Sequence, residues 1–182
     1  MHLAAFEGHV EVVKLLLGDP RVEVRAVHEK GFSALHFAAL EGCLEVVKLL
    51  LGDPRVDVGA VDKNGFSALH YAAHRGHVEV VKLFLGDPRV DVRAVVKEGW
   101  SALHFAADKG HVEVVKLLLG DPRVDVRAVE EEGFSALHCA ANSGYDEVVK
   151  LLLGDPRVDV GLLKRRGGRL CISLQIKAMT MW

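Results

Sequence analysis

The sequence contains no long hydrophobic run. Each VVKLLL or VVKLFL segment is interrupted by a lysine and followed by a glycine, so no stretch approaches the ~18 apolar residues of a membrane span. The first residues, MHLAAFEGH, have neither the basic segment nor the apolar core of a secretion signal. We therefore expect no membrane span and a cytoplasmic protein, with the nucleus as a second location.

Cysteine and unbalanced charge are also scarce. The chain has 23 Lys and Arg against 25 Asp and Glu, and this net charge of -2 gives no general attraction to nucleic acid or to anionic membranes. The three cysteines, Cys43, Cys139 and Cys171, are odd in number, and the first two belong to distant units of the repeat described below. A disulfide needs Cα atoms within about 7 Å of each other, so we expect free thiols and a reducing compartment.

What the chain does contain is a repeat with a spacing of 34 residues. The string GFSALH or GWSALH recurs, beginning at Gly31, Gly65, Gly99 and Gly133. A second set of glycines keeps the same spacing: Gly8, Gly42, Gly76, Gly110 and Gly144. A fixed period of this length predicts stacked units whose core is a strip shared between neighbours.

We divide residues 1–160 into five copies and treat residues 161–182 as a separate tail. The copies span residues 1–27 (truncated at its start), 28–61, 62–95, 96–129 and 130–160. The tail has no acid and five basic residues: Lys164, Arg165, Arg166, Arg169 and Lys177. We expect the chain to be a piece of a longer array and the tail not to share the repeat fold; the alternative is that the tail folds back as a cap.

The second copy predicts two short helices. Ser33 supplies an N-cap hydroxyl, and His36 stands three residues later, where a capping box has its second side chain. Phe32 can pack on Phe37 as a hydrophobic staple, and Gly42 allows a left-handed helix end. A second helix follows, with an exposed Glu–Lys pair and these side chains spaced for the core: Val46, Val47, Leu50 and Leu51. The alternating segment 55–59 then predicts extended chain leading to the next turn.

This unit resembles the ankyrin repeat. The family's Thr-Pro-Leu-His is matched by Ser33-Ala34-Leu35-His36, Ser67-Ala68-Leu69-His70, Ser101-Ala102-Leu103-His104 and Ser135-Ala136-Leu137-His138. The resemblance covers residues 1 to about 160 and implies an all-α repeat solenoid of stacked helix-turn-helix units with hairpin-like projections. The chain departs from the family in LLLGDPRVDV or its variants followed by Arg or Gly, which together with that last residue is one residue longer than the family's LLLxxGADVN and lacks its Asn.

Three recurrent patterns could indicate chemistry. The histidines of the SALH strings come once per copy, and a helix spacing of ~8–10 Å is too wide for a shared metal with ligands at ~2 Å. His74 and His77 are close in sequence but have no third ligand. Each Ser precedes its His by three residues, which is helix-cap spacing. Gly-Asp-Pro-Arg is interpreted as a helix stop with solvated Asp and Arg. We predict no metal, no cofactor and no enzymatic activity.

The copies differ from one another mainly in two places: the three residues before each GFSALH glycine, and the two residues after the paired alanines of the first helix. In the ankyrin family these are the hairpin tips and the end of the first helix, which line a concave partner-binding face. Neutral surface drift would also place variation there, but an extended concave surface is what a solenoid offers, so we favour recognition. The predicted partner-binding residues, including the aromatic residue before each cap, are Phe32, Lys63, Asn64, Phe66, His74, Arg75, Lys97, Glu98, Trp100, Asp108, Lys109, Glu131, Glu132 and Phe134.

The function we expect is that of a monomeric, non-enzymatic scaffold that binds a protein or peptide. One alternative is that the array belongs to a larger multidomain signalling, adaptor or channel protein whose activity lies outside this chain. A second, less favoured alternative is contact with nucleic acid or acidic lipid through the basic residues 164–169.

Overall fold

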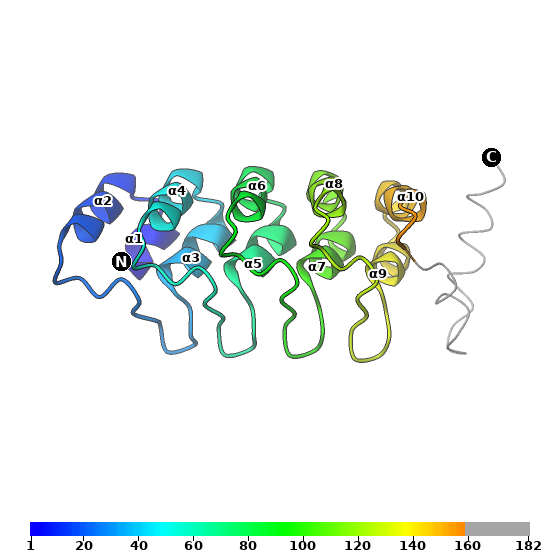
Figure 1. Ribbon diagram of the computed structural model, residues 1–182, viewed down its shortest axis with the longest axis horizontal. Helices are drawn as coiled ribbons and strands as arrows, with labels where there is room; N and C mark the ends of the chain where they lie inside the picture. The colour runs from blue at the N-terminus through cyan, green and yellow to red at the C-terminus, as the bar shows by residue number, and fades with distance from the viewer. Residues whose placement is uncertain (159–182) are drawn as a thin grey trace.

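The structure, a computed structural model, describes residues 1–158, which contain ten short helices in two rows (Figure 1). The first helices of the copies are α1 (His2–Phe6), α3 (Ala34–Glu41), α5 (Ala68–Arg75), α7 (Ala102–Asp108) and α9 (Ala136–Ser143). The second helices are α2 (Val10–Gly18), α4 (Leu44–Gly52), α6 (Val78–Gly86), α8 (Val112–Gly120) and α10 (Asp146–Gly154). The predicted all-α repeat solenoid is confirmed. The predicted tail lies outside the described residues.

Four of the first helices begin with the predicted capping box. In α3 the backbone N–H of His36 donates to Ser33 Oγ at 3.4 Å, and the N–H of Ser33 donates to His36 Nδ1 at 3.1 Å. Gly42 ends the helix with a φ of 70°, a left-handed conformation that favours glycine. The same box recurs at Ser67, Ser101 and Ser135. These helix starts follow from local sequence alone.

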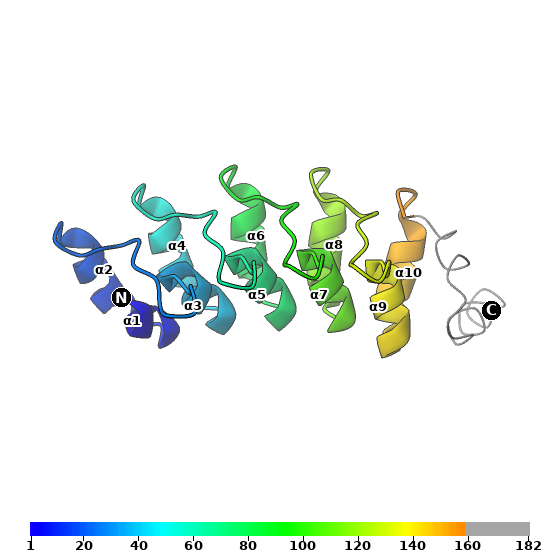
Figure 2. The same ribbon diagram turned by 90° about the horizontal axis from the view of Figure 1, so that it is seen from below.

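The core is a continuous strip between the two rows. Its members in the second copy include Leu35, Ala38, Ala39, Val46, Val47 and Leu50. Leu51 was predicted with them but is only partly buried, since it follows Leu50 round the helix and away from the strip. First helices pack on first helices of the neighbouring copies, and second helices on second helices (Figure 2). Each copy therefore completes the core of the next.

The segment that leaves each second helix is not extended, so that prediction is wrong. In the second copy the N–H of Val56 donates to Asp53 O at 3.1 Å, and the N–H of Ala60 to Asp57 O at 3.4 Å, which makes two successive turns. Val56 and Val58 are nonetheless buried while Asp57 is exposed. The alternating pattern therefore corresponds to alternating buried and exposed side chains, and it does not correspond to strand geometry. Among the described residues, strand-like pairing is limited to isolated bridges at the loop stems: Val61–Ser67, Val95–Ser101 and Val129–Ser135.

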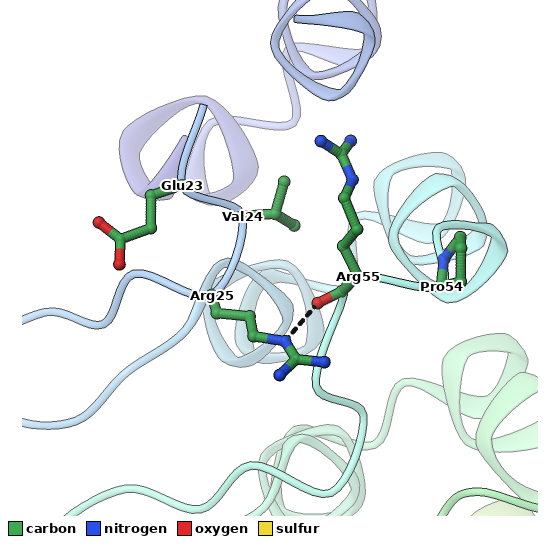
Figure 3. Close-up of a pocket in the computed structure, with 5 residues that line it drawn as sticks. All are labelled: Glu23, Val24, Arg25, Pro54 and Arg55. Atoms are coloured by element: carbon green, nitrogen blue, oxygen red, sulfur yellow. Dashed lines mark hydrogen bonds between the residues drawn. The ribbon is translucent and has the colours of Figure 1, made fainter. Parts of the chain in front are cut away.

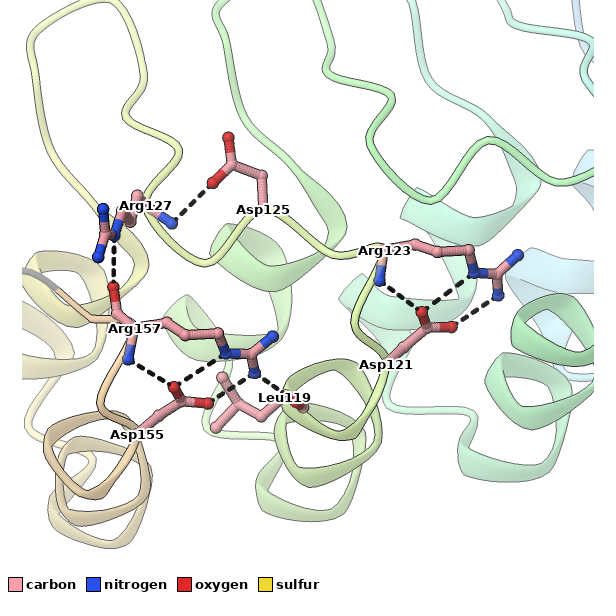
Figure 4. A network of polar contacts seen from close by, with 7 residues as sticks. All are labelled: Leu119, Asp121, Arg123, Asp125, Arg127, Asp155 and Arg157. Atoms are coloured by element: carbon pink, nitrogen blue, oxygen red, sulfur yellow. Dashed lines mark hydrogen bonds and ion pairs between the residues drawn. The ribbon is translucent and has the colours of Figure 1, made fainter.

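The Asp and Arg of the Gly-Asp-Pro-Arg motif are not simply solvated, contrary to the interpretation from sequence. Arg157 Nη2 lies 2.7 Å from the carboxylate of Asp155, which is only 12% exposed, and also donates to the carbonyl of Leu119 at the end of α8 (Figure 4). The same bond joins Arg55 to Leu17, Arg89 to Leu51 and Arg123 to Leu85. The last carbonyls of a helix have no partner within it, so an arginine from the next copy satisfies one of them. The motif is a tie between copies.

A second arginine adds another tie in most copies. Arg127 Nε donates to the carbonyl of Arg157 at 2.8 Å (Figure 4). Arg25 and Arg93 make the same bond to the following copy, at 2.8 and 2.7 Å. The second copy has Gly59 in this position and lacks the side chain that would make the bond.

Candidate functional site

The loops that project beyond the first helices form a continuous row of hairpin tips (Figure 1). Each tip donates one backbone hydrogen bond of 3.1 Å to the tip before it: Lys63 to Lys30, Lys97 to Asn64 and Glu131 to Glu98. Glycine is needed at this close approach, because a Cβ on Gly31 would lie 2.9 Å from the backbone nitrogen of Lys63. The predicted tip residues are all exposed: Lys63, Asn64, Lys97, Glu98, Glu131 and Glu132.

A row of aromatic rings in contact with one another lies at the base of these hairpins. The predicted staple is confirmed, with ring centroids 5.2 Å apart for Phe32 and Phe37. Phe32 also lies 5.1 Å from Tyr71 of the next copy, a contact that the sequence analysis missed. The same alternation continues through Phe66, Phe105 and Trp100, at centroid distances of 5.1 to 5.2 Å. We call these six rings the ring row. The signal that could have revealed it is that two positions of the repeat, the one before the cap and the one five residues later, are both aromatic in three consecutive copies.

The ring row stops at the fifth copy. Cys139 occupies the position that Phe37, Tyr71 and Phe105 hold in the preceding copies. The only ring contact of Phe134 within residues 1–158 is with His138, at 5.5 Å, and the Phe134 side chain is 40% exposed. Phe134 was predicted to bind a partner together with the aromatic residues before the other caps, and the structure places it beside the ring row and not in it.

The predicted residues at the ends of the first helices are engaged with neighbours. Arg75 lies 3.7 Å from the carboxylate of Glu41 in the preceding copy, and Lys109 pairs with Asp108 at 3.0 Å. His74 packs edge-on against Phe105 of the next copy at 5.8 Å. Burial, and then the charges of Lys109 and Arg75, lower the pKa of His74, so it is neutral at neutral pH. This group presents partly paired charges, whereas the tips present exposed ones.

Asp62 is a hairpin residue whose role the sequence analysis did not recognise. Its carboxylate is buried and accepts hydrogen bonds from the N–H groups of Asn64 (2.8 Å) and Phe66 (2.9 Å) and from the Tyr71 hydroxyl (2.7 Å). Burial and this carboxylate raise the pKa of Tyr71. Asp62 therefore fixes its hairpin to the first helix of the same copy. It has a structural role, although it stands at one of the variable positions before each GFSALH glycine that were predicted to serve recognition.

The four SALH histidines are buried capping groups. His36 Nδ1 accepts from the Ser33 N–H, so the proton lies on Nε2, which donates to the carbonyl of Phe66 in the next copy at 2.9 Å. His70 donates to Ala94 at 3.0 Å and His104 to Phe134 at 3.2 Å. Burial lowers the pKa of each, to about 4 for His70. In the described part of the chain, no group of three or more His, Cys, Asp and Glu side chains is placed to hold a metal ion.

Comparison with known families accounts for this arrangement. A sequence model of three consecutive ankyrin repeats matches residues 1–95 and again residues 88–163. The chain belongs to the ankyrin repeat family. Ankyrin repeats are generally protein–protein interaction modules and typically non-enzymatic. A search of curated proteins gave no match.

Three hollows of this ankyrin array have no ring-row residue among their linings. One, of about 460 Å³, is lined by Glu23, Val24, Arg25, Pro54 and Arg55 (Figure 3). Arg25 Nε is bonded to the carbonyl of Arg55, and the Arg55 guanidinium is paired with Asp53 at 2.6 Å. The lining residues include no nucleophile beside a general base. None of the helices within residues 1–158 has the length and apolar character needed to cross a bilayer.

Proposed function

We propose that this ankyrin array is a non-enzymatic scaffold that binds a protein or peptide along the hairpin tips of the second to fifth copies and the ring row beside them. The proposal includes the predicted partner-binding residues and a monomeric, cytoplasmic array. The observation that carries it is the coincidence of two features on one face. The tips have exposed side chains that differ between copies, and the ring row beside them is the same in character from the second copy to the fourth.

The physical basis is that rigid aromatic side chains offer contact area at low entropic cost. Trp100 is the largest member of the ring row, is only partly buried, and packs against Phe105 with the two ring planes inclined by 40°. The tip residues around it, Lys63, Lys97 and Glu98, supply charges of both signs that can select among partners. Trp100 is therefore the anchor that we propose, and the tip charges determine specificity.

The test begins with peptides selected from a random displayed library on the full chain, followed by affinity measurements on variants. Trp100→Ala should weaken binding by ~2 kcal/mol or more, as for an interface hot spot. Trp100→Phe reproduces the ring of the other copies, so it should fold normally and weaken binding only in part.

Thermal unfolding of both variants separates binding from folding. If Trp100→Ala lowered the melting temperature but left peptide affinity unchanged, the ring row would be structural. The binding face would then have to lie elsewhere. Lys116→Ala, on the second-row helix α8, is the matched control: it should leave peptide affinity unchanged if the binding face is the one proposed.

A further inference from the structure

The boundary between the second and third copies lacks an arginine that the other boundaries have. Arg25, Arg93 and Arg127 each donate from Nε to the backbone carbonyl 30 residues later, in the following copy. The equivalent pair at this boundary is Gly59 and the carbonyl of Arg89. Among the hydrogen bonds of residues 1–158, none ends on that carbonyl, so it lacks the donor that its counterparts have.

The backbone does not require glycine at position 59. In the described part of the chain, Gly59 is not among the glycines with a positive φ. A Cβ there would meet nothing closer than Asp57 Oδ1 at 3.8 Å. An arginine would therefore fit here as it does in the other copies, and the glycine leaves open the space that the arginine side chain crosses elsewhere.

A hollow of about 100 Å³ lies beside Gly59, which is one of its lining residues. Most of the lining is apolar and includes Val58, Leu69, Phe84, Val90 and Ala94. Sites for small molecules have volumes of ~300 Å³ or more, so this hollow fits part of one side chain and not a larger ligand. We name the hollow, together with Gly59 and the Arg89 carbonyl, the Gly59 site.

Two carboxylates lie at the Gly59 site. Asp91 lines the hollow and accepts a hydrogen bond from the N–H of Arg93 at 2.9 Å, while Asp57 Oδ1 accepts from the N–H of Gly59 at 3.1 Å. Both aspartates are exposed, and neither forms an ion pair within residues 1–158. The Arg93 side chain is directed to the carbonyl of Arg123 in the next copy. The site therefore offers negative charge beside an apolar hollow.

We propose that the Gly59 site binds an arginine side chain of a protein or peptide partner, which takes the place of the arginine that this boundary lacks. Its methylene stem lies on the apolar lining, and its guanidinium donates to the Arg89 carbonyl and to the carboxylate of Asp91. A guanidinium has five N–H donors in a fixed fork, so it can serve a carbonyl and a carboxylate together, and long basic side chains cover apolar surface with their stems. The site contains none of the predicted partner-binding residues, so the inference goes beyond the proposed function.

The experiment titrates the full chain with N-acetyl-arginine amide and follows the backbone amide signals by NMR. The signals that move should be those of residues 58–61 and 89–94, and they should saturate. N-acetyl-norleucine amide has a similar stem without the guanidinium and should leave these signals in place. N-acetyl-lysine amide should bind more weakly than the arginine probe, because an ammonium lacks the fork geometry.

A matched pair of substitutions tests the site itself. Gly59→Arg supplies the missing side chain from within the chain, so it should keep the fold and weaken binding of the arginine probe at least about tenfold, the value of one charge-assisted hydrogen bond. Gly59→Ala leaves the space open and should bind the probe as the parent does. Asp91→Asn should weaken binding, and Trp100→Ala should leave it unchanged because the ring row is not part of the site.

Three results would overturn the proposal. No movement of these amide signals with the arginine probe would show that the site binds no arginine. Equal movement with the norleucine probe would show that the hollow takes an apolar side chain. Binding that survives Gly59→Arg would show a general attraction to acidic surface. Each of these leaves the proposed function standing, since that function is tested by Trp100→Ala, and circular dichroism of each variant establishes that a loss is not unfolding.

Discussion

Residues 8–22 and 110–124 have the same sequence, GHVEVVKLLLGDPRV, and different surroundings. Val114 is fully buried against the preceding copy, whereas the equivalent Val12 is 44% exposed. His111 donates to the carbonyl of His74 at 2.9 Å, and Arg123 donates to that of Leu85. In the first copy, within the described residues, the equivalent histidine and arginine make no such bond to an earlier segment. The burial of these side chains and their hydrogen bonds between copies therefore depend on the position of the segment in the stack and not on its sequence.

The contrast shows where the stability of the array comes from. Helices of this length are marginal alone, because nucleation is costly and only tertiary packing compensates it. The helix and its internal Glu–Lys pair are present in both segments, at 2.6 Å in each. The two segments differ in whether one face packs against a preceding copy. Matched substitutions in the two segments therefore measure how much that copy contributes to the free energy of unfolding.

The largest difference should come from the buried leucine of the second helix. Leu118→Ala should lower the free energy of unfolding by about 2 to 5 kcal/mol, because it leaves a cavity in a fully buried place. Leu16→Ala, in the same position of the first copy, should cost less than half as much because Leu16 is only partly buried. Urea unfolding of the two variants measures this, and equal costs would contradict the comparison.

Acid should weaken the copies whose histidines the neighbours bury. The pKa of His70 is lowered from 6.5 to about 4, so as the pH falls below 6.5 the unfolded chain takes up a proton before the folded chain does. Stability is thus present above pH 6.5 and is lost down to about pH 4, by about 3 kcal/mol for this one group. Urea unfolding across this range measures the loss. The control is His70→Gln, which should show a shallower decline; a parent chain whose unfolding free energy does not change with pH here would refute the account.

A smaller contrast is expected for the arginine ties. Arg123→Gln removes a charge-assisted bond to Leu85 and should cost about 1 to 2 kcal/mol. Arg21→Gln removes only an exposed pair with Asp19, with the arginine side chain 88% exposed, and should change stability by less than about 0.5 kcal/mol. Melting temperatures of the two variants suffice for the test, and a larger effect at Arg21 would reverse the argument.

The smallest effect should be a gain. Gly59→Arg supplies the side chain that ties the other copies together, and a Cβ there meets nothing closer than 3.8 Å. The expected stabilisation is about 0.5 to 1 kcal/mol, part of it from the lower entropy of the unfolded chain. Gly59→Ala separates the two contributions, since it keeps the entropic part alone. Equal melting temperatures for the two variants would show that the tie itself adds nothing.

The features that could be predicted from the sequence are those built from near neighbours. Ser33 and His36 are three residues apart, and the repeat period places every copy, so helix starts, the core strip and the fold class were accessible. Ties such as Arg157 to Leu119 join residues 38 apart. A pattern that identifies Gly-Asp-Pro-Arg as a helix end does not show which carbonyl its arginine meets.

The candidate site divides in the same way. The exposure of tip residues such as Lys63 and Lys97 could be predicted, because polar residues next to a glycine indicate a turn at the surface. The pairing of Arg75 with Glu41 and the contact of Phe32 with Tyr71 needed the neighbouring copy in place. The interruption of the ring row at Cys139 is visible in the sequence as one odd residue in an aromatic column, but its meaning depends on knowing that this column is enclosed by rings from two copies.

The arginine ties have a mechanical consequence. The bonds that the two sets of arginines make between copies join residues 30 or 38 apart, so each spans one boundary and no more. A pull on the two ends of the chain would load these boundaries in series, and the weakest would open first while the others still held. The array should yield by peeling one copy at a time, with a force trace of small, evenly spaced steps in place of a single rupture.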